Sequence, residues 1–152
     1  MVAGLALMAA SAPGDFRPQD VQIFRPYPDE IPWELLRLAD ADEEPVFDYV
    51  DADYMRVAKH HDEPVGVYVV RALGPTVFEL CNLSVAMPFR RKGLGRWLLG
   101  HAIGISESKG AREILVRGAP LRGLFERTGF VQRPAAPGTG RSPELLLVLT
   151  PE

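Results

Sequence analysis

The sequence predicts an α+β protein in which helices flank a mixed, mostly antiparallel central sheet. Two observations lead to this prediction. Segments rich in β-branched and aromatic residues alternate with segments whose apolar residues recur at helical spacing. The segments follow one another in the order β-α-α-β-β-β-α-β-α-β, with three consecutive strands in the middle. The 152 residues fit one domain of ordinary globular composition.

The first third of the chain supplies one strand and two helices. Residues 21–24 predict a short strand that is ended by two prolines. Residues 29–38 predict a helix, because acidic residues and a proline occupy its first turn. Residues 45–54 predict a second short helix with apolar residues on one face. We expect residues 1–15 to be a poorly ordered N-terminal extension and residues 16–152 to form the single domain.

The remaining elements surround a loop that contains two glycines. Three strands bounded by turn-forming residues are expected to form an antiparallel meander, over residues 55–58, 65–71 and 77–85. After the loop we expect a helix, a strand, a short helix and a last strand, over residues 97–109, 113–117, 121–128 and 144–149.

The charge of the chain is distributed unevenly. Residues 1–65 carry fourteen acidic and five basic side chains, whereas residues 66–152 carry twelve basic and six acidic ones. This division is typical of a protein with two ligands of opposite charge, and equally of solvated faces that differ by chance. The basic residues gather about one loop in a chain of pI 5.6, so we expect no nucleic-acid partner.

Cysteine content and hydropathy bear on disulfides, metal sites and membrane association. Cys81 is the only cysteine, so an internal disulfide and a multi-cysteine metal site are excluded, no metal is expected, and a cytoplasmic setting fits. The longest apolar run, residues 2–10, is too short to span a bilayer, and no basic residue precedes it as in a signal peptide. No membrane partner is therefore expected.

The most informative segment is the basic loop of residues 90–96, whose sequence is RRKGLGR. Its two glycines allow successive backbone N–H groups to converge on one point, and a helix start there adds its positive dipole end. Four cationic side chains flank that point. The loop therefore predicts a binding site for a polyphosphate.

Two common phosphate-binding loops are excluded by spacing. A Walker loop needs four residues between its first glycine and Gly-Lys-Ser/Thr, which the chain lacks. A dinucleotide fingerprint needs a third glycine where Leu98 stands.

A third loop type matches. The Arg-x-x-Gly-x-Gly pattern follows a strand that ends in Leu-Ser-Val-Ala-Met-Pro, residues 83–88. A second block, residues 110–130, contains Leu-Phe-Glu-Arg-Thr-Gly-Phe. Together these blocks resemble the acyl-CoA-binding core of the GNAT superfamily of acyl-CoA-dependent N-acyltransferases. The resemblance covers about 55 residues in the expected order, and the fold it implies has the element order given above.

The resemblance implies an acetyl-CoA-dependent N-acetyltransferase that moves an acetyl group to a primary amine by direct attack in a ternary complex. The pantetheine arm of the cofactor is expected where the strands over 77–85 and 113–117 splay apart, with the Val85 N–H donating to the thioester carbonyl. The residues expected to bind acetyl-CoA are Leu83, Val85, Arg90, Arg91, Lys92, Gly93, Leu94, Gly95, Arg96 and Phe125.

Glu79 is the candidate catalytic base. An attacking alkylammonium must lose a proton, directly or through water, and several members of the superfamily carry a carboxylate at the matching position. Counting by twos along the strand predicts that Glu79 shares a face with Cys81, Leu83 and Val85. A solvent-facing or arginine-paired glutamate is the alternative.

Phe125 departs from the superfamily pattern. A tyrosine commonly stands there and protonates the leaving thiolate, and phenylalanine has no proton to give. Either the thiolate leaves unaided, or Ser84 or Tyr68 supplies the proton. A third alternative is that the chain is a non-catalytic acyl-CoA-binding or regulatory module.

The acceptor is expected over the two N-terminal helices, by resemblance. That region is rich in acids, which favours a cationic amine on a polyamine, an aminoglycoside-like sugar or a peptide. The acceptor itself, the oligomeric state and the donor chain length are left open, with a homodimer as one alternative. The acids of this region are Asp40, Asp42, Glu43, Glu44, Asp48, Asp51 and Asp53.

Overall fold

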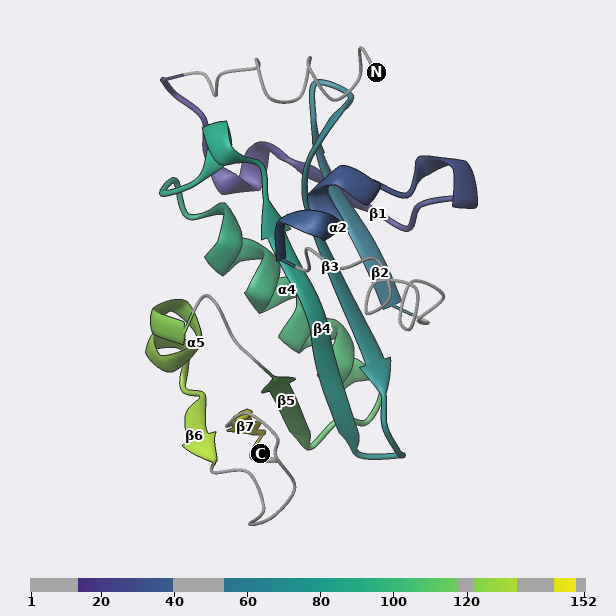
Figure 1. Cartoon of the computed structure of the whole chain (residues 1–152), viewed down its shortest axis with the longest axis vertical. Helices are drawn as coiled ribbons and strands as arrows, with labels where there is room; N and C mark the ends of the chain where they lie inside the picture. The colour runs from purple at the N-terminus through teal and green to yellow at the C-terminus, as the bar shows by residue number, and fades with distance from the viewer. Residues whose placement is uncertain (1–13, 40–53, 118–121, 134–143, 150–152) are drawn as a thin grey trace.

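A computed structural model describes residues 14–39, 54–117, 122–133 and 144–149 (Figure 1). Within these ranges the chain forms one seven-stranded sheet in the order β1-β2-β3-β4-β5-β7-β6. Neighbouring strands are antiparallel except for β4 and β5, which are parallel. The predicted α+β class with a mixed, mostly antiparallel sheet is confirmed. The strands are β1 (Gln22–Phe24), β2 (Tyr54–His60), β3 (Glu63–Ala72), β4 (Val77–Val85), β5 (Glu113–Arg117), β6 (Val131–Arg133) and β7 (Glu144–Val148).

Three α-helices accompany the sheet in the described ranges: α2 (Trp33–Ala39), α4 (Leu94–Ser108) and α5 (Arg122–Thr128). The predicted helix over 29–38 divides into a 3-10 turn at Pro28–Glu30 and α2, and α4 begins three residues before the predicted start. Within the part of the chain that the structure describes, no helix is long and apolar enough to cross a membrane.

The structure differs from the sequence prediction in two elements. The predicted helix over 45–54 lies outside the described residues except for Tyr54, and that assignment is wrong for Tyr54, which begins β2. Tyr54 pairs with Val70 of β3, so it belongs to the antiparallel meander. The sequence prediction also missed β6, a three-residue strand that pairs with β7.

Helices α2 and α4 pack on opposite faces of the sheet (Figure 1). On one face, the Tyr68 hydroxyl of β3 lies 2.6 Å from His101 Nδ1 of α4. On the other face, the Asn82 side chain of β4 donates to the Leu36 carbonyl of α2 at 2.8 Å. Both helices bury leucines against the strands, so the apolar core lies on either side of β3 and β4.

The central strands separate early. The parallel pairing of β4 and β5 covers only three residue pairs, from Val77↔Glu113 to Glu79↔Leu115. Beyond Glu79, β4 continues to Val85, and among the described strands only β3 pairs with this second half. Its other edge is therefore not paired with any strand that the structure describes.

A β-bulge lies in β4. Asn82 pairs with Val69, and Leu80 pairs with the next residue of β3, Val70, so Cys81 is an extra residue. The extra residue reverses the alternation of faces along β4. Glu79 therefore lies on the α2 face, and the prediction that it shares a face with Leu83 and Val85 is wrong.

Candidate functional site

A cavity of about 830 Å³ lies where β4 has separated from β5. Its wall combines the end of α2, the end of β4, the loop before α4, the start of α4 and one side of α5. The lining residues are Leu38, Leu83, Ser84, Val85, Arg90, Arg91, Gly93, Gly95, Arg96, Leu124, Arg127 and Thr128. Three helices, one strand and one loop thus meet at one hollow.

Most of the residues predicted to bind the cofactor lie on this wall. Lys92, Leu94 and Phe125 do not: Lys92 is exposed, and the side chains of Leu94 and Phe125 are buried in the core. The predicted residues that the structure brings together are Leu83, Val85, Arg90, Arg91, Gly93, Gly95 and Arg96.

The start of α4 presents backbone donors to the cavity. Gly93 has a left-handed φ of 88°, which L-residues other than glycine rarely adopt, and this turn allows α4 to begin at Leu94. The first hydrogen bond of the helix runs from the Trp97 N–H to the Gly93 carbonyl. The N–H groups of the three residues between them therefore have no carbonyl within the helix, and the helix dipole is positive there.

Basic side chains surround these donors. Arg90, Arg91, Lys92 and Arg96 are all exposed. Arg90 also donates from Nε to the Val85 carbonyl at 3.0 Å, which ties the loop to the end of β4. Backbone dipoles and four cations together suit an anion with several oxygens.

The end of β4 directs one further backbone donor, the Val85 N–H, to the edge at which the cavity lies. The Ala86 N–H donates to the Val65 carbonyl at 2.8 Å, so it points toward β3. Because alternate N–H groups of a strand point to opposite edges, the Val85 N–H points toward the side from which β5 has departed.

Glu79 is buried in β4 and does not line the cavity. Its Oε1 accepts from Arg71 at 2.9 Å, and its Oε2 lies 3.9 Å from Arg117 Nε. The structure therefore places this carboxylate between two guanidinium groups at the last residue pair of β4 and β5.

The two hydroxyl groups considered for the leaving thiolate occupy different places. Tyr68 lies under α4, where burial raises the pKa of its hydroxyl above the usual range, and it does not line the cavity. Ser84 lines the cavity. Phe125 stacks edge-on against Phe130, with ring centroids 5.3 Å apart.

Sequence reasoning missed four lining residues. Leu124, Arg127 and Thr128 recur at helical spacing on α5, so the block that carries the resemblance held a signal for them. Leu38 ends an amphipathic segment, and no local pattern indicates that it reaches the cavity.

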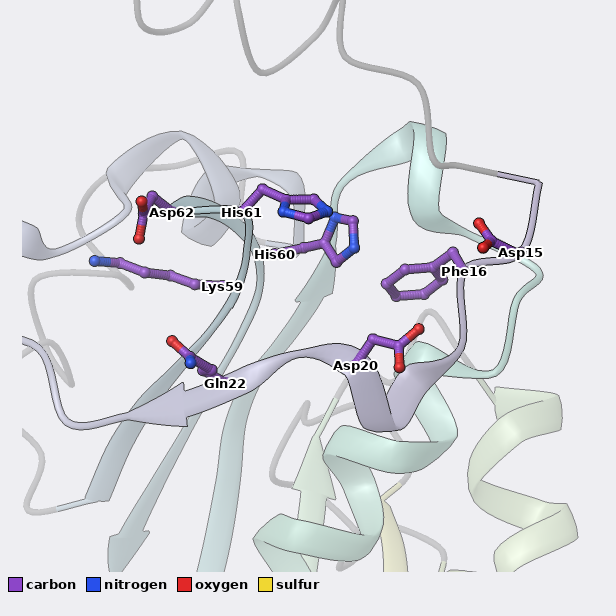
Figure 2. A pocket seen from close by; sticks show the side chains of 8 residues that line it. All are labelled: Asp15, Phe16, Asp20, Gln22, Lys59, His60, His61 and Asp62. Atoms are coloured by element: carbon purple, nitrogen blue, oxygen red, sulfur yellow. The ribbon is translucent and has the colours of Figure 1, made fainter.

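A second hollow, of about 420 Å³, lies between the N-terminal segment and the turn from β2 to β3 (Figure 2). His60 packs edge-on against Phe16 there, and the rings of His60 and His61 lie 4.1 Å apart. Among the described residues, no group of three or more histidine, cysteine or acidic side chains is placed to hold a metal ion.

Solved structures identify the fold. A GNAT family acetyltransferase from Elizabethkingia anophelis, solved with acetyl-CoA bound, matches with a TM-score of 0.71 at 23% identity, over 86% of this chain and 97% of that one. A Bacillus subtilis acetyltransferase solved in complex with CoA matches with a TM-score of 0.69 at 24% identity, over 86% and 98% of the two chains. The fold is that of an acetyltransferase.

Sequence comparison identifies the family. The model of the Acetyltransferase (GNAT) family matches residues 16–130. The uncharacterized N-acetyltransferase YvbK of Bacillus subtilis (strain 168) is 34% identical over 106 residues, which cover 67% of this chain and 68% of the relative. The chain belongs to the GNAT acetyltransferase family, as the resemblance predicted.

Proposed function

We propose that this protein is an acetyl-CoA-dependent N-acetyltransferase that acts on a primary amine of a cationic small molecule or peptide. The observation that carries the proposal is the cavity at which the open edge of β4 meets the basic start of α4. Acetyl-CoA or CoA is bound in structural neighbours of the same fold. The reaction is a direct attack of the amine on the thioester while both substrates are bound.

The cofactor is held by backbone groups and cations. Its pyrophosphate accepts from the N–H groups of the first turn of α4, with Arg91 and Arg96 as counter-charges. Its amide-rich pantetheine arm runs along the open edge of β4 as an added strand. The Val85 N–H then donates to the thioester carbonyl, where negative charge develops during attack.

Glu79 accepts the proton of the attacking ammonium through water. The support for this role is its burial and its position at the point where β4 and β5 part. Arg71 donates to Oε1 at 2.9 Å, and Oε2, which lies 3.9 Å from Arg117 Nε, is the oxygen that would receive the proton. An alkylammonium of pKa near 10.4 is neutral in only about one molecule in 2,500 at pH 7, which is why a base accelerates attack.

A second function, a non-catalytic acyl-CoA-binding module, is favoured by one observation. Phe125 is buried against Phe130 and offers no proton to a thiolate. A thiol is nevertheless a fair leaving group, since a thiol such as that of cysteine has a pKa near 8.5, so the enzyme is the proposal that fits better.

The test is a pair of measurements on one preparation. Binding of acetyl-CoA is measured by calorimetry, and release of free thiol is followed with polyamines, aminoglycosides, amino acids and basic peptides as acceptors. Thiol release with a cationic amine supports the enzyme. Tight binding without release across the panel favours the binding module, and absence of binding contradicts both.

A further inference from the structure

Three of the four buried polar side chains in the described ranges lie on one face of one strand. They are Glu79, Asn82 and Ser84, which are 6%, 3% and 4% exposed. The bulge at Cys81 places all three on the face toward α2, and we call them the polar row. The fourth, Ser106, bonds within α4 to the Ala102 carbonyl.

The hydrogen bonds of the polar row determine which of its side-chain groups donate and which accept. The Leu36 carbonyl can only accept, and it is one of the last four carbonyls of α2, which have no partner within that helix. Asn82 Nδ2 donates to it at 2.8 Å, so Asn82 Oδ1 must be turned toward Ser84. An amide oxygen only accepts, and the Ser84 hydroxyl therefore donates to it, at 2.7 Å.

These hydrogen bonds make Ser84, which lines the cavity, a hydrogen-bond acceptor there. Its only proton is held by Asn82, so its oxygen has lone pairs alone to present. A group whose proton is already donated is poorly placed to protonate a thiolate. It is well placed to accept a hydrogen bond from an N–H donor.

We propose that Ser84 Oγ accepts a hydrogen bond from the attacking amine of the acceptor substrate, and that Asn82 is the positioning residue that holds Ser84 in this state. The inference rests on the proposed acetyltransferase function. An amine or ammonium group carries N–H donors in every protonation state. Ser84 lies on the same face of β4 as the candidate base Glu79, and of these two residues Ser84 is the one that lines the cavity.

The pantetheine arm also contains amide N–H groups, so the experiment must separate two donors. The acceptor amine is favoured because Ser84 lies on the face of β4 toward α2, away from Leu83 and Val85, and Leu38 of α2 lines the same cavity. If Ser84 served the pantetheine instead, its loss would weaken acetyl-CoA binding.

The test compares Ser84→Ala with Ser84→Thr, which keeps the hydroxyl, and with Ser106→Ala, which removes another buried serine far from the cavity. Acceptor kinetics are measured with spermidine or whichever panel amine the wild type acetylates, and acetyl-CoA affinity is measured by calorimetry. We expect Ser84→Ala to lower kcat/KM for the acceptor about 10- to 100-fold, as for a lost hydrogen bond to a charged donor. Acetyl-CoA affinity should stay within about 2-fold, and Ser106→Ala should match the wild type.

The positioning role of Asn82 has its own readout. Asn82→Ala frees the Ser84 hydroxyl to rotate, so the acceptor KM should rise while acetyl-CoA affinity is retained. A merely structural effect would weaken both together.

Three results would overturn the proposal. Unchanged acceptor kinetics in Ser84→Ala would remove the contact altogether. A loss of acetyl-CoA affinity equal to the kinetic loss would assign Ser84 to the pantetheine. An equal loss in Ser84→Thr would show that packing matters and the hydroxyl does not. If the wild type binds acetyl-CoA and acetylates no amine, the proposed function itself fails. That failure is distinguishable from a failure of the Ser84 proposal, because it appears in the wild type and not only in the variants.

Discussion

The two sides of the cavity are built in different ways. On the cofactor side, the turn at Gly93 and the first turn of α4 present backbone N–H groups, and exposed arginines surround them. On the proposed acceptor side, Ser84 lines the cavity, and the polar row to which it belongs consists of buried side chains that are bonded to α2 and to arginines. The cofactor side therefore depends on the path of the backbone, and the acceptor side on individual side chains.

This difference predicts which property each substitution changes. Changes on the cofactor side should alter acetyl-CoA affinity. Changes in the polar row should alter turnover or stability while acetyl-CoA affinity persists.

The largest effect is expected at Glu79. Glu79→Gln removes the proposed base, so kcat should fall about 100-fold or more, within the range of general base catalysis. Acetyl-CoA affinity, measured by calorimetry, should be retained, which also shows that the fold tolerates the loss of the pair with Arg71. Glu107→Gln, on the exposed surface of α4, is the control. An unchanged kcat would remove Glu79 from the mechanism and leave acetyl transfer intact.

A large effect on stability is expected at Asn82. Asn82→Ala leaves the buried Leu36 carbonyl without its donor, and Ser84 without its acceptor. The free energy of unfolding should fall by about 1–3 kcal/mol, measured by urea denaturation. A loss well below this range would mean that water replaces the amide and that α2 is not fixed through Asn82.

Gly93 tests the cofactor side. Gly93→Val places a branched side chain at a φ of 88°, with its Cβ 3.2 Å from Pro18 Cγ, so the turn must move and the N–H groups with it. Acetyl-CoA affinity should fall about 10-fold, the equivalent of about 1.4 kcal/mol. Gly100→Ala is the matched control, since a Cβ there meets no atom within 4 Å. Equal affinity in both variants would show that the turn does not set the binding site.

The smallest effect is expected away from both sides, at the Tyr68–His101 pair. The pKa of His101 is lowered by burial and then by the Arg56 charge, so the folded protein favours the neutral ring. Its stabilisation is fully present above the unfolded pKa of about 6.5 and is lost as the pH falls through the lower folded pKa.

His101→Gln should therefore flatten the dependence of unfolding free energy on pH below about 6.5, and cost about 1 kcal/mol at pH 8. Urea denaturation between pH 5 and pH 8 measures both quantities. An unchanged slope would show that His101 does not contribute to the acid sensitivity. Acetyl-CoA affinity should not change, because neither residue lines the cavity.

The same comparison explains what the sequence could predict. The cofactor side is local in sequence: a strand end, a basic loop with two glycines and a helix start occupy one continuous segment, so its pattern indicated both the fold and the ligand class. Even there, the burial of Leu94 and Phe125 shows that a motif does not say which side chains face the ligand.

The acceptor side is not local. Counting by twos assumes a regular strand, and the extra residue Cys81 reverses the count. Nothing in the local sequence marks the bulge, because it is fixed by the pairing of β4 with β3. The hydrogen bond from Asn82 to Leu36 likewise joins residues 46 positions apart. The arrangement of the polar row therefore could not be predicted from the local sequence.

The most direct measurement is a crystal structure of the protein with coenzyme A. We expect the pyrophosphate oxygens within about 2.7–3.2 Å of the N–H groups of Leu94, Gly95 and Arg96. The pantetheine arm should lie along the edge of β4 at Leu83 and Val85. Coenzyme A seated elsewhere, for example in the hollow of Figure 2, would contradict the central claim that the open edge of β4 and the start of α4 form the cofactor site.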